Sequence, residues 1–243
     1  MAAGLGSRLG NLTKSLPKAL IPVAGKPLLA YGLAFARLLE PRRIFVVGGF
    51  EFEKVKTALE NLTTGAAADL PIELVRNDEF RRGNILSFQA ARPHLQGDFL
   101  LLNVDHIYRP AIAPLVRASV SDVTGFVDTD RSLGADDMKV LRNADGQIEQ
   151  IAKTLSQWDC GYVGMTKVPA TARARYLAEV DAAMAEDSLD IHVERVLGRL
   201  ARSAAAPHCR DISGHGWLEV DTPDERSHAE AQLGDGSWSD LRA

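Results

Sequence analysis

The feature that most constrains the fold is a regular alternation of short apolar runs, rich in β-branched residues, with longer stretches of helical periodicity. Such alternation is typical of a sheet covered by helices on both faces, because each strand returns to the sheet through a crossover. The sequence therefore predicts an α/β fold of Rossmann-like, three-layer α/β/α type with a mixed, mostly parallel sheet. We expect strands at about 44–48, 72–76, 99–104 and 122–128, and helices at 27–39, 53–62 and 84–94.

The second half of the chain has a different pattern. Residues 139–142 and 147–151 flank an Asp-Gly turn and predict a hairpin, which is followed by a strand at 161–168. Two stretches with helical spacing, 170–184 and 189–201, are predicted to pack against the core.

Composition limits the class of protein. A chain of 243 residues with 46% hydrophobic content is typical of one globular α/β domain. The net charge of −4 offers no general basic surface for nucleic acid, and no apolar run approaches membrane-spanning length. Cys160 and Cys209 are isolated, so we expect reduced, partly buried thiols. Nothing at the start resembles a signal peptide, so we expect a cytoplasmic location. We also expect a monomer or a homodimer.

A glycine-rich turn near the start carries the clearest chemical signal. Gly4-Leu5-Gly6-Ser7-Arg8 is followed after a short gap by Pro17-Lys18. Glycines allow backbone N–H groups to approach a phosphate, while a guanidinium and an ammonium supply the positive charge that a triphosphate needs. The segment therefore predicts a nucleotide-binding loop.

Two other nucleotide-binding motifs, the dinucleotide-binding Rossmann turn and the P-loop, are also rich in glycine. A dinucleotide-binding Rossmann turn needs a third glycine where Leu9 stands, although Glu51 or Glu53 could serve as its ribose-binding acid, so this alternative stays open. A P-loop is excluded, because Gly25-Lys26 is followed by proline and has no glycine at the required upstream position.

Two aspartates are candidates for a metal site. Asp105 follows the predicted buried strand at 99–104, at the end where open α/β sheets place ligand groups. Asp221 precedes Thr222 and Glu225, which form a capping box for the last helix and leave the aspartate spare. Carboxylates of this kind hold Mg²⁺ together with phosphate oxygens and water, and Glu219 is a weaker candidate.

The loop resembles the signature of nucleotidyltransferases that couple an NTP to a phosphorylated sugar or alcohol. Segment 77–87 looks like the nucleotide-pocket segment of cytidylyltransferases for phospho-alcohols, including those for phosphocholine and inositol-1-phosphate. The segments that look most like inositol-1-phosphate cytidylyltransferases are 105–108, 128–131, 151–153 and 158–161. The resemblance weakens beyond about residue 168. It implies a nucleotide-diphospho-sugar transferase fold whose first strand is truncated here, because Met1 stands where that strand would end.

The resemblance also implies the organisation of the chain and the roles of its residues. Within a single domain, residues 1–128 would bind the nucleotide, residues 129–233 would bind the acceptor, and 234–243 would form a loose tail. Mg²⁺ would serve as cofactor, and CTP and a small phosphorylated alcohol would be the partners. The implied sites are Ala3, Gly4, Gly6, Asn84 and Ser87 for the nucleotide; Arg8, Lys18 and Lys153 for catalysis; Asp130, Asp136, Lys139 and Asp159 for the acceptor; and Asp105 and Asp221 for the metal.

The chemistry needs no protein nucleophile. A phosphomonoester has a second pKa near ~6 and so arrives ionised at neutral pH, ready to attack the α-phosphorus. No covalent intermediate is therefore expected, and the resemblance implies a transfer of CMP from CTP to the acceptor, inositol-1-phosphate first, with release of pyrophosphate. The alternatives are a hexose-1-phosphate, phosphocholine or aminoethylphosphonate acceptor, an NAD(P)-binding Rossmann protein, and a non-catalytic nucleotide-binding protein. His106 is predicted to contact substrate or to support a neighbouring residue.

Overall fold

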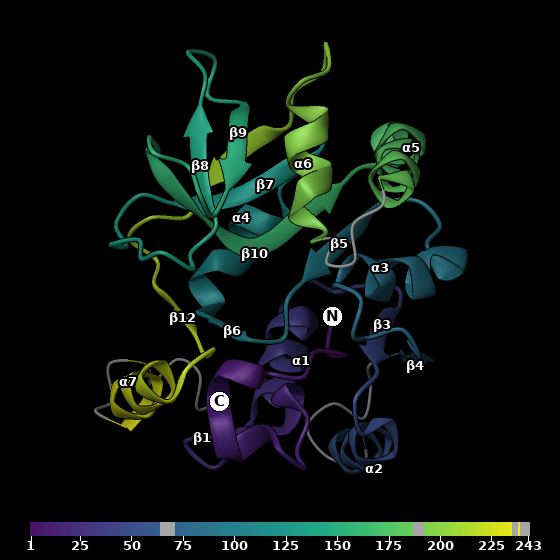
Figure 1. Ribbon diagram of the computed structural model, residues 1–243, viewed down its shortest axis with the longest axis vertical. Coiled ribbons are helices and arrows are strands. Elements are labelled where there is room, and N and C mark those ends of the chain that lie inside the picture. The colour runs from purple at the N-terminus through teal and green to yellow at the C-terminus, as the bar shows by residue number, and fades with distance from the viewer. Residues whose placement is uncertain (64–70, 187–191, 235–237, 239–243) are drawn as a thin grey trace.

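The computed structural model describes residues 1–63, 71–186, 192–234 and 238. Strands run through the middle of the molecule and helices lie around them (Figure 1). The helices are α1 (Leu28–Leu38), α2 (Phe52–Thr63), α3 (Ile85–Ala91), α4 (Ala113–Arg117), α5 (Ala170–Ala185), α6 (Glu194–Leu200) and α7 (Pro223–Gly234), with 3-10 turns η1 (Ser7–Thr13), η2 (Lys18–Leu20), η3 (Arg92–His94) and η4 (Pro110–Ile112). The strands are β1 (Pro22–Val23), β2 (Lys26–Pro27), β3 (Ile44–Gly48), β4 (Ile72–Arg76), β5 (Phe99–Leu102), β6 (His106–Tyr108), β7 (Thr124–Asp128), β8 (Lys139–Arg142), β9 (Ile148–Ala152), β10 (Cys160–Val168), β11 (His208–Asp211) and β12 (Trp217–Glu219).

The sheet is mixed, so the prediction of a mostly parallel sheet is wrong. The long strand β10 lies antiparallel to β5, β7 and β8, and β8 lies antiparallel to β9. Parallel pairing is limited to β3 with β4 and β11 with β7 within the described ranges. The hydrophobic pattern gives the burial of β10 but not its direction, because a strand buried on both faces reads the same either way.

The first residues join two sheets that are otherwise separate. The N–H of Ala2 donates to the Val47 carbonyl on β3, and the carbonyl of Met1 accepts from Val104, just beyond β5. Residues 1–3 therefore run between β3 and the extension of β5, which places the glycine turn at the ends of both strands.

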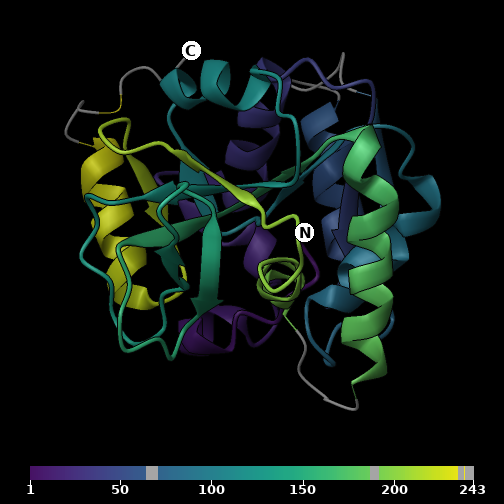
Figure 2. The ribbon, with the colours of Figure 1, turned by 90° about the horizontal axis from the view of Figure 1, so that it is seen from above.

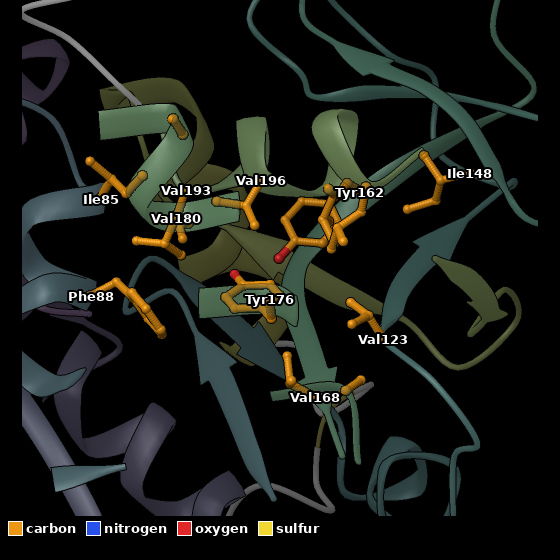
Figure 3. Close-up of a cluster of buried hydrophobic side chains, with 14 of the residues drawn as sticks. Ile85, Phe88, Val123, Ile148, Tyr162, Val168, Tyr176, Val180, Val193 and Val196 are labelled. Carbon is orange, nitrogen blue, oxygen red and sulfur yellow. The ribbon is translucent and has the colours of Figure 1, made fainter. Parts of the chain in front are cut away.

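Helices cover both faces of the central strands. On β7, Val127 belongs to a core cluster with residues of α3, α5 and α6, while its neighbour Phe126 packs with residues of α1 and α4. This alternation follows from the period of two along a strand and produces three layers. The first of these clusters includes Tyr176, Val180 and Val196 (Figure 3). Viewed from above, α5 and α7 lie on opposite sides of the molecule (Figure 2).

Most predicted elements are present with small differences at their ends. The strands at 44–48 and 72–76 are confirmed residue for residue, and the hairpin at 139–152 is confirmed. The predicted helix at 189–201 begins at Glu194, and residues 189–191 lie outside the described residues. Within the predicted tail, Trp238 is the residue beyond α7 that the structure describes. The guanidinium carbon Cζ of Arg109 lies over its indole ring, 4.5 Å from the ring centroid. In the described ranges, no helix has the length and apolar character needed to cross a membrane.

Candidate active site

Charged side chains from distant segments meet at the ends of β5 and β12. The ammonium Nζ of Lys18 lies 2.6 Å from Oδ2 of Asp105 and also contacts Oδ1 of Asp221. The guanidinium of Arg8 contacts the other oxygen of Asp221 and lies 3.3 Å from Oδ2 of Asp136. The structure thus brings together both predicted metal ligands, both predicted triphosphate cations and one predicted acceptor residue.

The backbone of the glycine turn is shaped around Lys18. Gly6 has a positive φ of 63°, and a Cβ there would lie 3.0 Å from both Cβ of Lys18 and Cγ2 of Thr13. The hydroxyl of Thr13 donates to the Gly6 carbonyl at 2.8 Å and holds the turn closed. Glycine is therefore required at position 6, because a side chain would be strained and would push Lys18 away from the carboxylates.

The two aspartates are fixed by their own backbone. The N–H of Val220 donates to the Asp105 carbonyl at 2.9 Å, which extends the pairing of β12 with β6 toward the site. The predicted capping box is present, because Thr222 Oγ1 accepts from Glu225 N at 3.2 Å and Glu225 Oε2 accepts from Thr222 N at 3.0 Å. Glu225 also accepts from the N–H of Asp221, so the carboxylate of Asp221 is free to face Lys18 and Arg8.

Burial makes the charges of this cluster interdependent. Lys18 is 6% exposed and Asp221 is 8% exposed. Burial alone would raise the pKa of Asp105, but the charges of Lys18 and His106 and the hydrogen bonds they donate hold that pKa well below its ordinary value. Asp105 is therefore an anion at neutral pH, as a ligand for a cation requires.

The buried imidazole of His106 contacts the carboxylate of Asp105. Its Nδ1 lies 2.6 Å from Oδ1 of Asp105, and its ring stacks on Trp217 with centroids 5.2 Å apart. Burial lowers the pKa of His106, but the adjacent charge of Asp105 outweighs it and the net shift is upward. Gly164, with φ of 70°, lies against the same ring, where a Cβ would come within 2.6 Å of Cε1.

One feature of the site was missed in the sequence. Arg131 lies over the Trp217 ring, with 4.5 Å from Cζ to the centroid, and pairs with Glu219 at 3.2 Å. The same guanidinium lies within 4 Å of Asp137 and Glu225. Glu219, considered in the sequence as a weaker metal candidate, is thus paired with a cation. The signal was the placement of Trp217 and Glu219 on one face of β12, two residues apart.

The other predicted nucleotide residues line the adjoining segments. Ala3 is buried and accepts from the Phe50 N–H, while Gly4 is exposed with no atom near a notional Cβ. The buried Ser87 hydroxyl lies 3.1 Å from the Asn77 amide. The side-chain oxygen Oδ1 of Asn84 accepts a hydrogen bond from the backbone N–H of Val193 at 2.6 Å, and this bond ties the start of α3 to the start of α6.

The predicted acceptor residues are not equally available. The ammonium of Lys139 is buried and donates to the carbonyls of Gly134 and Lys153 at 2.6 and 2.8 Å. Asp130 accepts from the Gly214 N–H at 2.7 Å, and Asp159 pairs with Arg142 at 3.1 Å. The structure does not bring these two aspartates into the Lys18 cluster. Lys153 is half-buried, and its ammonium has no ion-pair partner among the described residues.

The donor set fits a hard divalent ion. The carboxylates of Asp105 and Asp221 converge on the single ammonium of Lys18, so they could share one cation. Nowhere in the described ranges, this site included, is a group of three or more acidic, histidine or cysteine side chains arranged to hold a metal, so an ion here would depend on ligands from the substrate and from water. Two carboxylates completed by phosphate oxygens and water match the preference of Mg²⁺.

Known proteins resemble this chain over nearly its whole length. The chain is 27% identical to a bifunctional IPC transferase and DIPP synthase of Aquifex aeolicus over 96% of its own length and 50% of the relative. It is 30% identical to the CMP-5'-(3-aminopropyl)phosphonate synthase of Streptomyces rubellomurinus over 95% of its own length and 37% of that protein. The chain therefore spans half or less of the length of these two relatives.

The fold is that of a solved nucleotidyltransferase. The structure of the inositol-1-phosphate CTP transferase from T. maritima superposes with a TM-score of 0.80 at 19% identity, over 97% of this chain and 94% of the other. A family model described as the MobA-like NTP transferase domain matches residues 1–205. The chain belongs to the family of MobA-like NTP transferases.

Proposed function

We propose that this chain transfers the cytidylyl group of CTP to a small phosphorylated alcohol, inositol-1-phosphate first among them, and releases pyrophosphate. The observation that carries the proposal is the convergence of Arg8, Lys18, Asp105 and Asp221 on one point. Two cations and two carboxylates together suit a substrate that brings its own phosphates and a divalent ion. The choice of CTP rests on the cytidylyl chemistry named for the relatives.

The nucleotide half would hold the triphosphate. Backbone N–H groups of the turn at Gly4 and Gly6 would face the phosphates, and Arg8 and Lys18 would exchange their carboxylate partners for phosphate oxygens. Asn84 and Ser87 are proposed to lie near the base. Lys18 would then neutralise charge that grows on the departing pyrophosphate, where a fixed cation is most effective.

Asp105 and Asp221 would hold the ion. A bound Mg²⁺ would screen the two mutually repelling anions and polarise the α-phosphate. His106 would keep Asp105 ionised and oriented through the contact between its Nδ1 and Oδ1.

The transfer step balances without a protein base. An oxygen of the acceptor phosphate attacks the α-phosphorus, a new P–O bond forms, and the bond from the α-phosphorus to the bridging oxygen of pyrophosphate breaks. The electron pair leaves with pyrophosphate. Lys153 is proposed to orient the acceptor phosphate, with Asp136 nearby beside Arg8, while the positions of Asp130, Lys139 and Asp159 favour support of the surrounding loops.

A pyrophosphate-release screen tests the proposal. The four NTPs would be crossed with inositol-1-phosphate, phosphocholine, 2-aminoethylphosphonate and hexose-1-phosphates, each with and without Mg²⁺. We expect release with CTP and a phospho-alcohol and none without the metal. Release only with an NTP other than CTP and a hexose-1-phosphate would replace both the nucleotide and the acceptor class. Stabilisation by NAD(P) without any release would favour a dinucleotide-binding function, and CTP binding without turnover would favour a non-catalytic one.

A further inference from the structure

A buried carboxylate lies where the two halves of the chain meet. Glu194 is the first residue of α6 and is 6% exposed. One of its oxygens, Oε1, lies 3.4 Å from the amide of Asn103, at the end of β5 and two residues before Asp105. The preceding residue, Val193, is bound by Asn84. Glu194 thus lies between the segments that lead to the proposed base pocket and the proposed metal ligands.

The other carboxylate oxygen has no partner. Oε2 of Glu194 is buried, and no hydrogen bond reaches it from the described residues. Such groups are uncommon in folded proteins, because a buried acceptor without a donor loses its bonds to water and gains nothing in return. Nor does any lysine, arginine or histidine of the described ranges form an ion pair with it.

Two buried tyrosines, Tyr162 and Tyr176, lie near enough to Glu194 to be affected by its charge. Burial first, and the charge of Glu194 second, raise the pKa of Tyr176 and of Tyr162. Both tyrosines therefore stay neutral, and the Tyr162 hydroxyl is already 2.7 Å from Thr166. The close-up of this cluster shows both rings near Val196, which follows Glu194 by two residues on α6 (Figure 3). Neither tyrosine hydroxyl forms a hydrogen bond with Oε2 of Glu194, so this acceptor stays available to a donor from a ligand.

We propose that Glu194 is a specificity-determining residue, which accepts a hydrogen bond from a donor on the alcohol part of the phosphorylated acceptor. The inference rests on the proposed function and narrows the acceptor to molecules that carry a hydroxyl or a protonated amine beyond the phosphate. A donor group on the substrate would form the missing hydrogen bond to Oε2. A phosphorylated substrate without such a group would leave Oε2 without a hydrogen bond. Sites built this way discriminate strongly, because the wrong ligand leaves a buried polar group unpaired.

Three acceptors separate the sources of the donor. Inositol-1-phosphate offers hydroxyls, phosphoethanolamine offers an ammonium, and phosphocholine has a cation without an N–H. With a hydroxyl donor, Glu194→Gln keeps most activity, since the amide oxygen still accepts, whereas Glu194→Leu loses at least about tenfold in kcat/KM. With an ammonium donor, both variants lose at least about tenfold, because the charge is also removed. In each case the loss should be in acceptor KM, and phosphocholine turnover should change little.

The control is Glu179→Gln. Glu179 is on α5 and pairs with Arg199 of α6 at 2.7 Å, so this variant makes the same chemical change beside the same helix without touching Glu194. It should leave the acceptor preference unchanged. Thermal melting of each variant would accompany the kinetics, and Glu194→Leu should melt no lower than the wild type, because it removes an unmet acceptor.

The outcomes distinguish this inference from the proposed function. A wild type that turns over CTP with a phospho-alcohol supports the function. If folded Glu194→Leu then keeps the same acceptor preference, or changes KM for CTP and not for the acceptor, Glu194 does not read the acceptor. A wild type inactive with every pair removes the function and this role with it.

Discussion

The ammonium of Lys18 and the carboxylate of Asp105 form an ion pair, with Nζ and Oδ2 2.6 Å apart, although 87 residues separate them in the sequence. Lys18 also contacts Asp221, so it occupies the position between the two carboxylates that a divalent ion would need. In the proposed mechanism, a metal ion and Lys18 would compete for the same oxygens, and a nucleotide that drew Lys18 to its phosphates would open the position.

Lys18→Ala tests this competition directly. Loss of the ammonium leaves two largely buried carboxylates without their shared partner and should destabilise the fold by about 3 kcal/mol. Mg²⁺ added without nucleotide should then raise the melting temperature of the variant more than that of the wild type, because binding to the folded state adds stability. Lys54→Ala, which changes an exposed lysine bound to Ser15, is the matched control. Equal Mg²⁺ shifts in all three proteins would contradict the competition.

Asp105→Ala and Asp221→Ala should each nearly abolish Mg²⁺-dependent turnover while the protein stays folded. Each substitution removes one of two carboxylates from a site that works by charge. Pyrophosphate release at limiting Mg²⁺ measures the effect. Asp136→Ala is the comparison, because its exposed carboxylate pairs with Arg8 and lies outside the proposed metal site, so its loss should have a smaller effect. Normal turnover of either first variant would remove that aspartate from the metal site.

Lys139→Ala should lower the stability of the protein, whereas Lys153→Ala should change its kinetics with the acceptor. The Lys139 ammonium holds carbonyls of two loops, so its loss should lower the melting temperature. Lys153 has an available ammonium, so its loss should raise KM for the acceptor and leave KM for CTP nearly unchanged. Steady-state kinetics with each substrate varied in turn would measure both constants. An unchanged acceptor KM and kcat in Lys153→Ala would defeat the assignment.

The cysteines predict a pH effect on stability. Burial raises the pKa of Cys209 to about 12, whereas an exposed thiol titrates near ~8.5. Above ~8.5 the unfolded chain loses a proton that the folded chain keeps, so this contribution to stability is complete below ~8.5 and declines as the pH rises. The urea concentration at the midpoint of unfolding should be lower at pH 10 than at pH 8. This decrease should be smaller in Cys209→Ala than in the wild type. Fast reaction of the folded protein with a thiol reagent at pH 8 would argue against the buried thiol.

Gly164→Ala should weaken the site without touching its charges. A methyl group there would approach the His106 ring to 2.6 Å in a backbone conformation that favours glycine, so the ring and Asp105 must shift. We expect a lower melting temperature and a lower kcat, with a smaller change in KM. Gly146→Ala, at a turn with φ of 73° and open space around it, is a control for backbone strain alone.

The sequence predicts those parts of the fold that hydrophobic pattern and turn chemistry specify. Strands β3 and β4 are apolar and lie between clear helices, so their ends could be predicted to the residue. Strand β11 is polar and short, and it was missed because backbone pairing with β7 holds it in place. The direction of β10 was also missed, since direction depends on contacts far apart in the chain.

The same distinction applies to the site. Arg8, Lys18, Asp105 and Asp221 could be found because a glycine turn, a strand end and a capping box mark them locally. Lys139 was predicted to line the acceptor side, and only the folded loops show that its ammonium is enclosed by carbonyls. Arg131 and Glu194 carry no local motif, because their partners come from other parts of the chain.

The contact between Arg8 and Asp221 joins residues 213 positions apart, which sets a time at which the site can exist. During synthesis the glycine turn leaves the ribosome first, and the strands that carry Asp105 and then Asp221 follow, at about 5–20 residues per second. Until β12 pairs with β6, Lys18 and Arg8 lack one of their two carboxylates. A nascent chain therefore cannot complete this charge cluster before Asp221 has been added and β12 has paired with β6, so a chain that stops before β12 would not carry the finished site.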